Sequence, residues 1–144
     1  MKQICSRQDI PSLLRSHGLR ATPQRIAVAE ILFETPTHVT PQQTLDALKP
    51  RFPSISQNTI YLTLSHFEAS GLLQRIFVDG KTIFDSNMHK HDHAYCRNCR
   101  KLIDLPLVDK EKKPRQISGW NIQGESRVWT GLCPACRKTE TIPL

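Results

Sequence analysis

Residues 88–104, MHKHDHAYCRNCRKLID, contain three histidines, two cysteines and two aspartates, all of which are potential metal ligands. His89, His91 and His93 alternate along the chain, so in an extended segment they project from one face. Imidazole and carboxylate donors suit Fe(II), Mn(II) or zinc, whereas paired cysteines favour zinc. The segment thus carries donors for two kinds of metal site. Its spacing alone leaves open whether the histidines form a genuine site or a solvated linker.

Four of the five cysteines form two C-x-x-C pairs, Cys96/Cys99 and Cys133/Cys136. Two such pairs complete a tetrahedral four-cysteine zinc site, and redox dithiols are the alternative interpretation. The stretch between the pairs exceeds the roughly 15–20 residues of a zinc ribbon, so we expect each pair on a separate hairpin of a small domain. Cys5 remains, and we expect it to be a free thiol.

The first 85 residues read as helices followed by a hairpin. Thr22-Pro23 and Thr40-Pro41 each combine an N-cap with proline at the first helical position, and Ser56 caps the segment SQNTIYLTLSHFEAS. Two apolar runs flank Asp79-Gly80, a strong turn signal for a hairpin. This order of elements predicts a winged helix-turn-helix domain over residues 1–85.

From Ser86 onwards histidine, cysteine and charge replace the helical pattern, and short apolar runs indicate strands. We therefore predict a hinge over residues 86–92 and a small domain over residues 93–144. A domain so short often needs a structural metal. The polar stretch DKEKKPRQIS is expected to connect its strands, with room for one helix. The fold class predicted for the whole chain is α+β.

The chain carries 20 basic and 13 acidic residues, a net charge of +7, and its pI is about 9.4. A basic protein suits a polyanionic partner such as DNA, because each neutralised phosphate releases counterions. No apolar run approaches the roughly 18 residues that span a bilayer, and the N-terminus lacks the apolar region of a secretory signal. We therefore expect a cytoplasmic protein that does not engage a membrane.

The helix that begins after Ser56 has two distinct faces. Ile60, Leu64 and Phe67 follow the i, i+4, i+7 spacing of a buried face. Glutamine and asparagine can read adenine, and tyrosine can reach phosphate or a thymine methyl group. The helix contains no Arg or Lys, so phosphate contacts are expected from its surroundings. The predicted DNA-binding residues are Arg20, Gln57, Asn58, Tyr61 and Lys81.

The chain resembles the ferric uptake regulator (Fur) family from about residue 13 to residue 139. The matching motifs are GLRATPQR, ISQNTIYLTLSHFEASGLL, HDHAYCRNCRKLID and CPAC. The resemblance implies a winged-helix DNA-binding domain joined to a small C-terminal α/β dimerisation domain with a four-cysteine zinc site. It also implies a homodimer that binds an A/T-rich palindromic operator on double-stranded DNA when a regulatory metal is bound.

Within the family, the chain is most similar to the peroxide-sensing (PerR) branch. The regulatory Fe(II) or Mn(II) ligands that this resemblance implies are His38, Asp85, His91, His93 and Asp104. Iron-sensing members usually carry glutamate where Asp85 and Asp104 stand. In the branch, iron at this site reacts with peroxide and a ligating histidine is oxidised, which implies His38 and His91 as targets. The manganese form would be insensitive.

The chain departs from the family pattern at an additional metal site near the dimer interface. Lys90 and Glu125 stand where that site has histidines, and Asp92 and Glu111 are the acidic residues that remain. Leu62 stands where iron-sensing members place an arginine after the recognition tyrosine, which predicts a different operator preference.

The sequence therefore predicts a metal-dependent, DNA-binding transcriptional repressor that senses peroxide through oxidation of a regulatory-site histidine. A regulator of iron or manganese availability with the same site is the leading alternative, followed by a zinc-uptake regulator. A C-x-x-C oxidoreductase or H-x-H metal hydrolase is disfavoured, because the sequence offers no plausible general base outside the ligand set and no thioredoxin-like βαβ pattern. We predict that the protein is not an enzyme.

Overall fold

The chain divides into two compact units, Met1–Met88 and His89–Leu144, which we call the N-terminal and C-terminal units. The computed structural model describes residues 9–34, 38–107, 116–117, 119–121 and 125–139. Among these residues no helix is long and apolar enough to cross a membrane. The domain limits predicted from the sequence, including the hinge, stay predictions.

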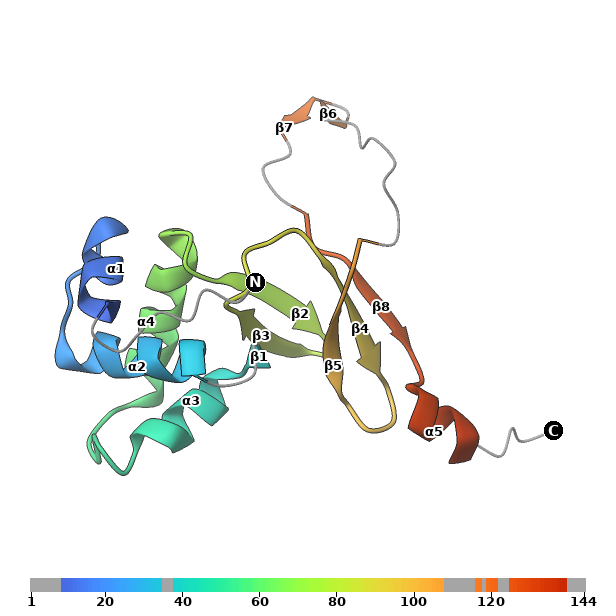
Figure 1. The fold of residues 1–144 in the computed structure, drawn as a ribbon, viewed down its shortest axis with the longest axis horizontal. Coiled ribbons are helices and arrows are strands. Elements are labelled where there is room, and N and C mark those ends of the chain that lie inside the picture. The colour runs from blue at the N-terminus through green and yellow to red at the C-terminus, as the bar shows by residue number, and fades with distance from the viewer. Residues whose placement is uncertain (1–8, 35–37, 108–115, 118, 122–124, 140–144) are drawn as a thin grey trace. The chain divides into compact units, whose positions relative to one another are not determined.

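In its described residues, the N-terminal unit combines four helices with a small antiparallel sheet (Figure 1). The helices are α1 (Ile10–Ser16), α2 (Pro23–Glu34), α3 (Pro41–Leu48) and α4 (Gln57–Ala69). The strands β1 (His38–Val39), β2 (Gln74–Val78) and β3 (Lys81–Asp85) pair in the order β1-β3-β2. This is the predicted winged helix-turn-helix order, with β2 and β3 as the wing. Strand β1 was not predicted, because a strand of two residues is too short to show the alternation of apolar and polar residues that marks a strand.

The core of the N-terminal unit lies between its helices and the sheet. Ile60, Leu64 and Phe67 are all buried, so the predicted inner face of α4 is confirmed. The same cluster includes Leu14 of α1, Val28 of α2, Leu45 of α3 and Phe84 of β3. These contacts hold α4 in a fixed orientation and leave its other face to solvent.

Side-chain caps start α3 and α4 at the predicted residues. Thr40 Oγ1 accepts a hydrogen bond from the Gln43 backbone N–H (3.1 Å), and Gln43 Oε1 accepts one from the Thr40 N–H (2.9 Å). Ser56 Oγ accepts from the Thr59 N–H at 3.1 Å. Between β2 and β3, Asp79 and Gly80 both have positive φ, as a tight hairpin with a two-residue loop requires.

The C-terminal unit is a three-stranded sheet with a short hairpin and a terminal helix (Figure 1). Strands β4 (Asp92–Cys96), β5 (Leu102–Leu105) and β8 (Val128–Gly131) pair in the order β5-β4-β8. Strand β4 is antiparallel to β5 and parallel to β8. The remaining elements are the paired strands β6 (Gln116–Ile117) and β7 (Trp120–Asn121) and the helix α5 (Pro134–Thr139).

The prediction that each cysteine pair lies on its own hairpin is half wrong. Cys96 and Cys99 do lie at the turn between β4 and β5, but Cys133 and Cys136 flank the start of α5. Pro134 occupies the first helical position, where its missing N–H costs nothing, so the second pair begins a helix. The helix considered for DKEKKPRQIS falls largely on residues outside the described part of the chain.

Strand register places a histidine opposite an aspartate in each unit. His38 on β1 pairs with Asp85 on β3, and His93 on β4 pairs with Asp104 on β5. Residues that face each other across antiparallel strands project their side chains from the same side of the sheet. The fold thus positions two His–Asp pairs, one in each unit.

Replacement of Thr40 by alanine removes the capping oxygen of α3 and is expected to destabilise the N-terminal unit by about 1 kcal/mol. The measurement is urea unfolding of the Thr40→Ala variant against the parent. Thr40→Ser, which keeps the accepting hydroxyl, is the matched control and should lose much less. Equal stability of the alanine and serine variants would contradict the role of the cap.

Candidate metal sites and nucleic-acid surface

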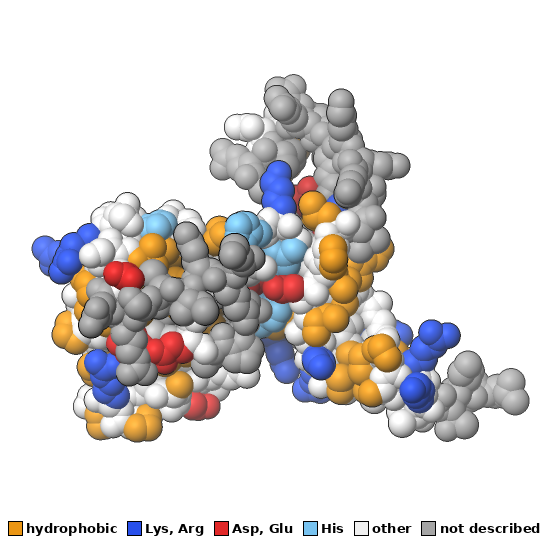
Figure 2. All heavy atoms as spheres, in the orientation of Figure 1, with side chains coloured by type: hydrophobic (Ala, Val, Ile, Leu, Met, Phe, Trp, Pro, Cys, Tyr) orange, Lys and Arg blue, Asp and Glu red, His pale blue; other side chains and the backbone are white. Residues whose placement is uncertain are grey.

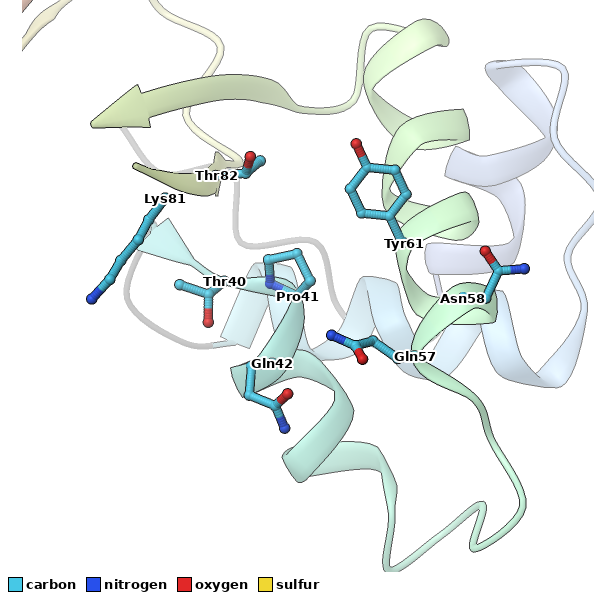
Figure 3. Close-up of a pocket in the computed structure, with 8 residues that line it drawn as sticks. All are labelled: Thr40, Pro41, Gln42, Gln57, Asn58, Tyr61, Lys81 and Thr82. Carbon is cyan, nitrogen blue, oxygen red and sulfur yellow. The ribbon is translucent and has the colours of Figure 1, made fainter. Parts of the chain in front are cut away.

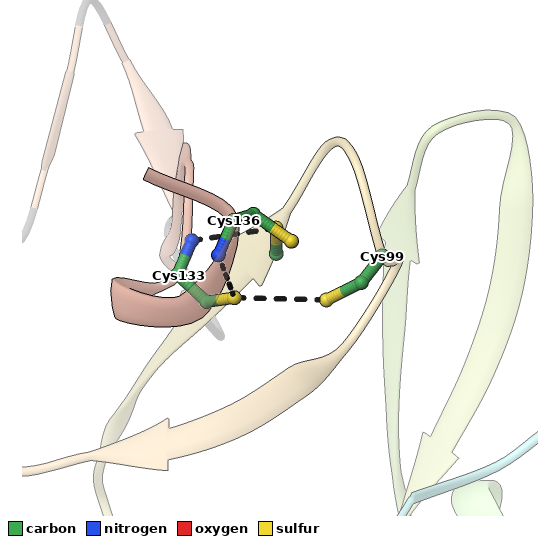
Figure 4. A group of neighbouring side chains, drawn as sticks. Cys99, Cys133 and Cys136 are labelled. Carbon is green, nitrogen blue, oxygen red and sulfur yellow. Dashed lines mark hydrogen bonds between the residues drawn. The ribbon is translucent and has the colours of Figure 1, made fainter. Parts of the chain in front are cut away.

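The four predicted zinc ligands come together in the C-terminal unit. Ligand atoms of Cys96, Cys99, Cys133 and Cys136 all lie within 4.8 Å of one another. Figure 4 shows the thiols of Cys99 and Cys133 pointing at each other, 3.8 Å apart. In a tetrahedral site with Zn–S bonds of about 2.3 Å, neighbouring sulfurs are about 3.8 Å apart. The cluster therefore has the dimensions of a four-cysteine zinc site.

Backbone N–H groups point at the sulfurs of this cluster. The Cys133 N–H donates to Cys96 Sγ (3.3 Å), and the Cys136 N–H donates to Cys133 Sγ (3.4 Å). Hydrogen bonds from the backbone of Cys133 and Cys99 lower the pKa of the Cys96 thiol to about 6. Cys96 is therefore favoured as a thiolate at neutral pH, which is the form that binds metal.

The pKa of the Cys136 thiol shifts in the opposite direction. Its contact with the Asn98 side chain lowers the pKa of the Cys136 thiol, but hydrogen bonding to Cys133 and burial raise it to about 11. Four thiols this close cannot all lose their protons without a cation, because each new thiolate repels the others. A divalent ion removes that repulsion, so the electrostatics of the cluster fit a bound metal.

The N-terminal unit holds one predicted pair of regulatory ligands, His38 and Asp85. His38 Nε2 lies 3.6 Å from Asp85 Oδ2, and Asp85 is fully buried. The Gln74 amide donates to Asp85 Oδ2 (3.4 Å), and the Asn87 backbone N–H donates to Asp85 Oδ1 (2.8 Å). These bonds orient the carboxylate as outer-shell partners orient metal ligands. The contact of Gln74 with Asp85 was not predicted from the sequence, because it depends on the register that places the two residues opposite each other on β2 and β3.

The C-terminal unit holds the other three predicted ligands, and they converge. The Nε2 atoms of His91 and His93 are 2.9 Å apart, and Asp104 Oδ1 lies 3.3 Å from the first and 3.5 Å from the second. His91 Nδ1 donates to the carbonyl of His89, so in neutral His91 the Nε2 atom carries the lone pair. Two nitrogens bound at about 2.1 Å and at right angles are about 3 Å apart, so the geometry suits chelation.

The face of β4 opposite the histidines carries a different polar network. Asp92 is buried and accepts a hydrogen bond from Trp129 Nε1 at 3.0 Å. Arg127 Nε lies 3.6 Å from Asp92 Oδ1, and Arg127 Nη2 lies 3.6 Å from Glu125 Oε1. These contacts tie β4 to β8 and to the residue before it, beside the predicted metal ligands. Asp92 and Glu125 thus share Arg127 as a common partner.

Four of the five predicted DNA-binding residues line one groove of the N-terminal unit, about 700 Å³ in volume (Figure 3). Gln57, Asn58 and Tyr61 come from α4, and Lys81 comes from β3 at the tip of the wing. The groove is completed by Thr40, Pro41, Gln42 and Thr82. The fifth residue, Arg20, is exposed before α2 and is not among the lining residues.

Arg75 on β2 is a charged residue that sequence reasoning missed. It contacts three side chains of α4, namely Tyr61, Ser65 and Glu68. Burial lowers the pKa of Arg75, but hydrogen bonds to Tyr61 and Glu68 raise it above the ordinary value overall. The sequence shows that these three α4 residues share one helix face. It does not show that β2 packs against that face.

Basic side chains are spread over several elements. On the face of the N-terminal unit drawn in Figure 2, Lys and Arg side chains lie at separate places and do not form one patch. In the C-terminal unit, Arg137 and Lys138 occupy the last turn of α5. On this face of the N-terminal unit, a contact with a polyanion would draw on several elements.

The chain matches the family model described as "Ferric uptake regulator family" over residues 16–127. It is 34% identical over 134 residues to the peroxide-responsive repressor PerR of Staphylococcus saprophyticus, an alignment that covers 90% of each chain.

Two solved structures show the same fold. The ferric uptake regulator of Pseudomonas aeruginosa, solved with manganese, aligns with a TM-score of 0.66 at 26% identity, over 87% of this chain and 98% of that one. Fur of Helicobacter pylori, described as having three functional metal-binding sites, aligns with a TM-score of 0.71 at 19% identity, over 99% and 100% of the two chains.

Loss of one cluster thiol should release the metal held by the cluster. We expect Cys99→Ser, after dialysis against a weak chelator, to retain far less than one divalent ion per chain and to lose structure in the C-terminal unit, because three thiolates bind more weakly than four. Elemental analysis and circular dichroism measure both effects. Cys5→Ser is the control and should keep the ion. Full retention by Cys99→Ser would show that the cluster does not hold it.

Proposed function

The chain belongs to the ferric uptake regulator family, and on this premise we propose that it is a metal-dependent transcriptional repressor, a homodimer that binds DNA and responds to peroxide. The observation that carries the proposal is the pair of cross-strand His–Asp contacts, His38 with Asp85 and His93 with Asp104. Both are aspartates, which the peroxide-sensing branch uses where iron sensors usually have glutamate. Such a repressor would work in the cytoplasm.

The nucleic-acid role is supported by charge and by the groove beside α4. The chain carries a net charge of +7, which favours a polyanion. Gln57 and Asn58 are exposed amides at the start of α4, at the edge of the groove, where they could form bidentate hydrogen bonds with adenine (Figure 3). Lys81 at the wing and Arg20 would contact phosphate. The proposed operator is an A/T-rich palindrome, whose symmetry matches a homodimer.

The proposed structural metal is zinc, bound by Cys96, Cys99, Cys133 and Cys136. Support comes from the 3.8 Å sulfur separation and from the lowered pKa of Cys96. Zinc has no redox chemistry of its own, so its role would be to stabilise a C-terminal unit whose described residues include few buried apolar side chains.

The proposed regulatory metal is Fe(II) or Mn(II), with His38 and Asp85 as ligands from the N-terminal unit. His91, His93 and Asp104 would complete the set from the C-terminal unit. Nitrogen and carboxylate oxygen donors without thiolate suit these ions. One ion bound by both units would fix their relative angle and so the spacing of the two recognition helices in a dimer. Metal would then favour the DNA-competent state because it binds that state better.

Peroxide sensing would act through the same ligands. Ferrous iron held there would promote cleavage of the O–O bond of peroxide, with one oxygen leaving as water and the other replacing a ring hydrogen of a ligating histidine. The two-electron oxidation of the histidine would balance the two-electron reduction of peroxide. His38 and His91 are the proposed sites of oxidation, and each would gain one oxygen atom. A ligand altered in this way binds metal less well, so the two units would lose their fixed angle and the DNA would be released.

The leading alternative is a regulator of iron or manganese availability that uses the same ligands without oxidation. Both functions predict metal-dependent DNA binding, so this property does not separate them. They differ in what peroxide does to the iron-loaded protein.

We expect peroxide to add oxygen to His38 or His91 of the Fe(II)-loaded protein and to abolish its DNA binding. The Mn(II)-loaded protein should remain unmodified and bound, because Mn(II) does not reduce peroxide in this way. Peptide mapping by mass spectrometry locates the added oxygen. His89, outside the proposed ligand set, serves as the internal control and should stay unmodified. An unmodified Fe(II) form that still binds DNA would favour the availability regulator.

Asp104→Glu tests whether the short carboxylate matters. Because the longer side chain can still reach a metal, we expect Mn(II)-dependent DNA binding to persist with at most a few-fold change in affinity. Oxidation of the Fe(II) form should slow by about tenfold or more, since we expect glutamate to leave less room at the iron for peroxide. The measurement is the rate of histidine oxidation at fixed peroxide. An oxidation rate equal to that of the parent would show that the short carboxylate of Asp104 does not determine the sensitivity to peroxide.

A further inference from the structure

Each of the three nitrogen atoms of the Arg75 guanidinium bonds to a side chain of α4. Arg75 Nε donates to Glu68 Oε2 at 2.9 Å, and Nη2 lies 2.7 Å from the same oxygen. Nη1 donates to the Tyr61 hydroxyl at 2.9 Å, and Nη2 donates to Ser65 Oγ at 3.2 Å. The guanidinium carbon lies 5.4 Å from the Tyr61 ring centroid and 5.1 Å from that of Phe84. A planar fork with bonds in several directions leaves little freedom to rotate.

The three helix partners of Arg75 are spaced along one face of α4. Tyr61, Ser65 and Glu68 follow i, i+4, i+7, so their side chains form a single row. Arg75 itself belongs to β2, the first strand of the wing. One side chain therefore bonds the wing to about two turns of α4.

The bond to Tyr61 also sets the hydrogen-bonding role of that side chain. A phenol has one hydrogen to donate, and the Tyr61 oxygen already accepts from Arg75 Nη1. Its own hydrogen is left to point at an acceptor. In DNA, acceptors that a tyrosine could reach include phosphate oxygens, thymine O4 and purine N7. Figure 3 shows the Tyr61 ring beside the groove with Asn58 one turn away on the same helix.

We propose that Arg75 is a positioning residue for DNA reading: it fixes the wing against α4 and presets Tyr61 as a hydrogen-bond donor to the duplex. The inference rests on the proposed DNA-binding function. It assigns to Arg75 no phosphate contact of its own, because its bonds are directed at α4. A basic residue beside the groove thus contributes to specificity and not to general electrostatic attraction.

The test compares Arg75→Met and Arg75→Lys with the Mn(II)-loaded parent protein. The probe is the palindromic duplex that the parent enriches from a random pool, and the competitor is a scrambled duplex of equal composition. We expect Arg75→Met to lower the affinity ratio of palindrome to scrambled duplex by about tenfold, the scale of one or two lost hydrogen bonds. Arg75→Lys keeps the charge but loses the fork, so its ratio should also fall, which keeps the test valid if the methionine variant folds poorly.

Salt dependence separates positioning from phosphate contact. We expect the slope of log affinity against log salt concentration to be unchanged in both variants, whereas a lost phosphate contact would reduce it by about 0.9. Arg51→Met is the matched control, because Arg51 also pairs with a glutamate (Glu30, 2.9 Å) and lies against an aromatic ring, but outside the α4–wing contact. Its affinity ratio should stay at the parent value.

The Tyr61→Phe variant completes a double-mutant cycle. If Arg75 acts through the Tyr61 hydroxyl, Arg75→Met should lower the ratio much less in the Tyr61→Phe background than in the parent. An unchanged ratio in both Arg75 variants, or equal losses on both duplexes with a smaller salt slope, would overturn the role of Arg75. If the parent enriches no palindrome, the proposed function itself fails, and that result is distinct from a failure of Arg75.

Discussion

A histidine held directly opposite an aspartate by two antiparallel strands is the constraint on which the proposed regulatory chemistry depends. The register of β1 with β3 sets His38 against Asp85, and the register of β4 with β5 sets His93 against Asp104. A slip of one residue would turn one member of each pair to the other face of its sheet. The same backbone hydrogen bonds that build the sheets therefore preorganise the donors, and little side-chain entropy remains to be lost when an ion binds.

Strand β4 shows how one short segment serves two sites. His93 lies on one face of the strand, while Asp92 projects from the other face into the network with Trp129 and Arg127. Cys96 ends the strand and belongs to the thiol cluster. Because alternation places His93 and Cys96 on opposite faces of β4, an ion that prefers thiolate and an ion that prefers nitrogen and oxygen could be held three residues apart.

Much of this could be predicted from the sequence, for reasons that differ between elements. The caps at Thr40 and Ser56 and the Asp79-Gly80 turn are local signals, and each was found where it was expected. The resemblance supplied the ligand set, and the structure brings its members together within each unit. Strand β1 and the roles of Gln74 and Arg75 were missed, since each is defined by a partner distant in sequence. The helix at Cys136 was missed although Pro134 gives it a local start signal.

The two residues missed on β2 are neighbours, and together they connect the metal ligands with the reading surface. Gln74 donates to Asp85 on β3, while Arg75, on the opposite face of the same strand, donates to Tyr61 on α4. A rigid antiparallel pair transmits displacement because its ladder hydrogen bonds must shift together. If metal binding pulls Asp85, the strand that carries Arg75 cannot stay in place without strain in the β2–β3 pairing. The N-terminal unit thus contains a chain of contacts from Asp85, a proposed metal ligand, through two neighbouring residues of β2 to Tyr61, a proposed DNA-reading side chain. Substitutions at Gln74 should therefore weaken the effect of metal on DNA binding while every proposed metal ligand and DNA-reading residue stays in place.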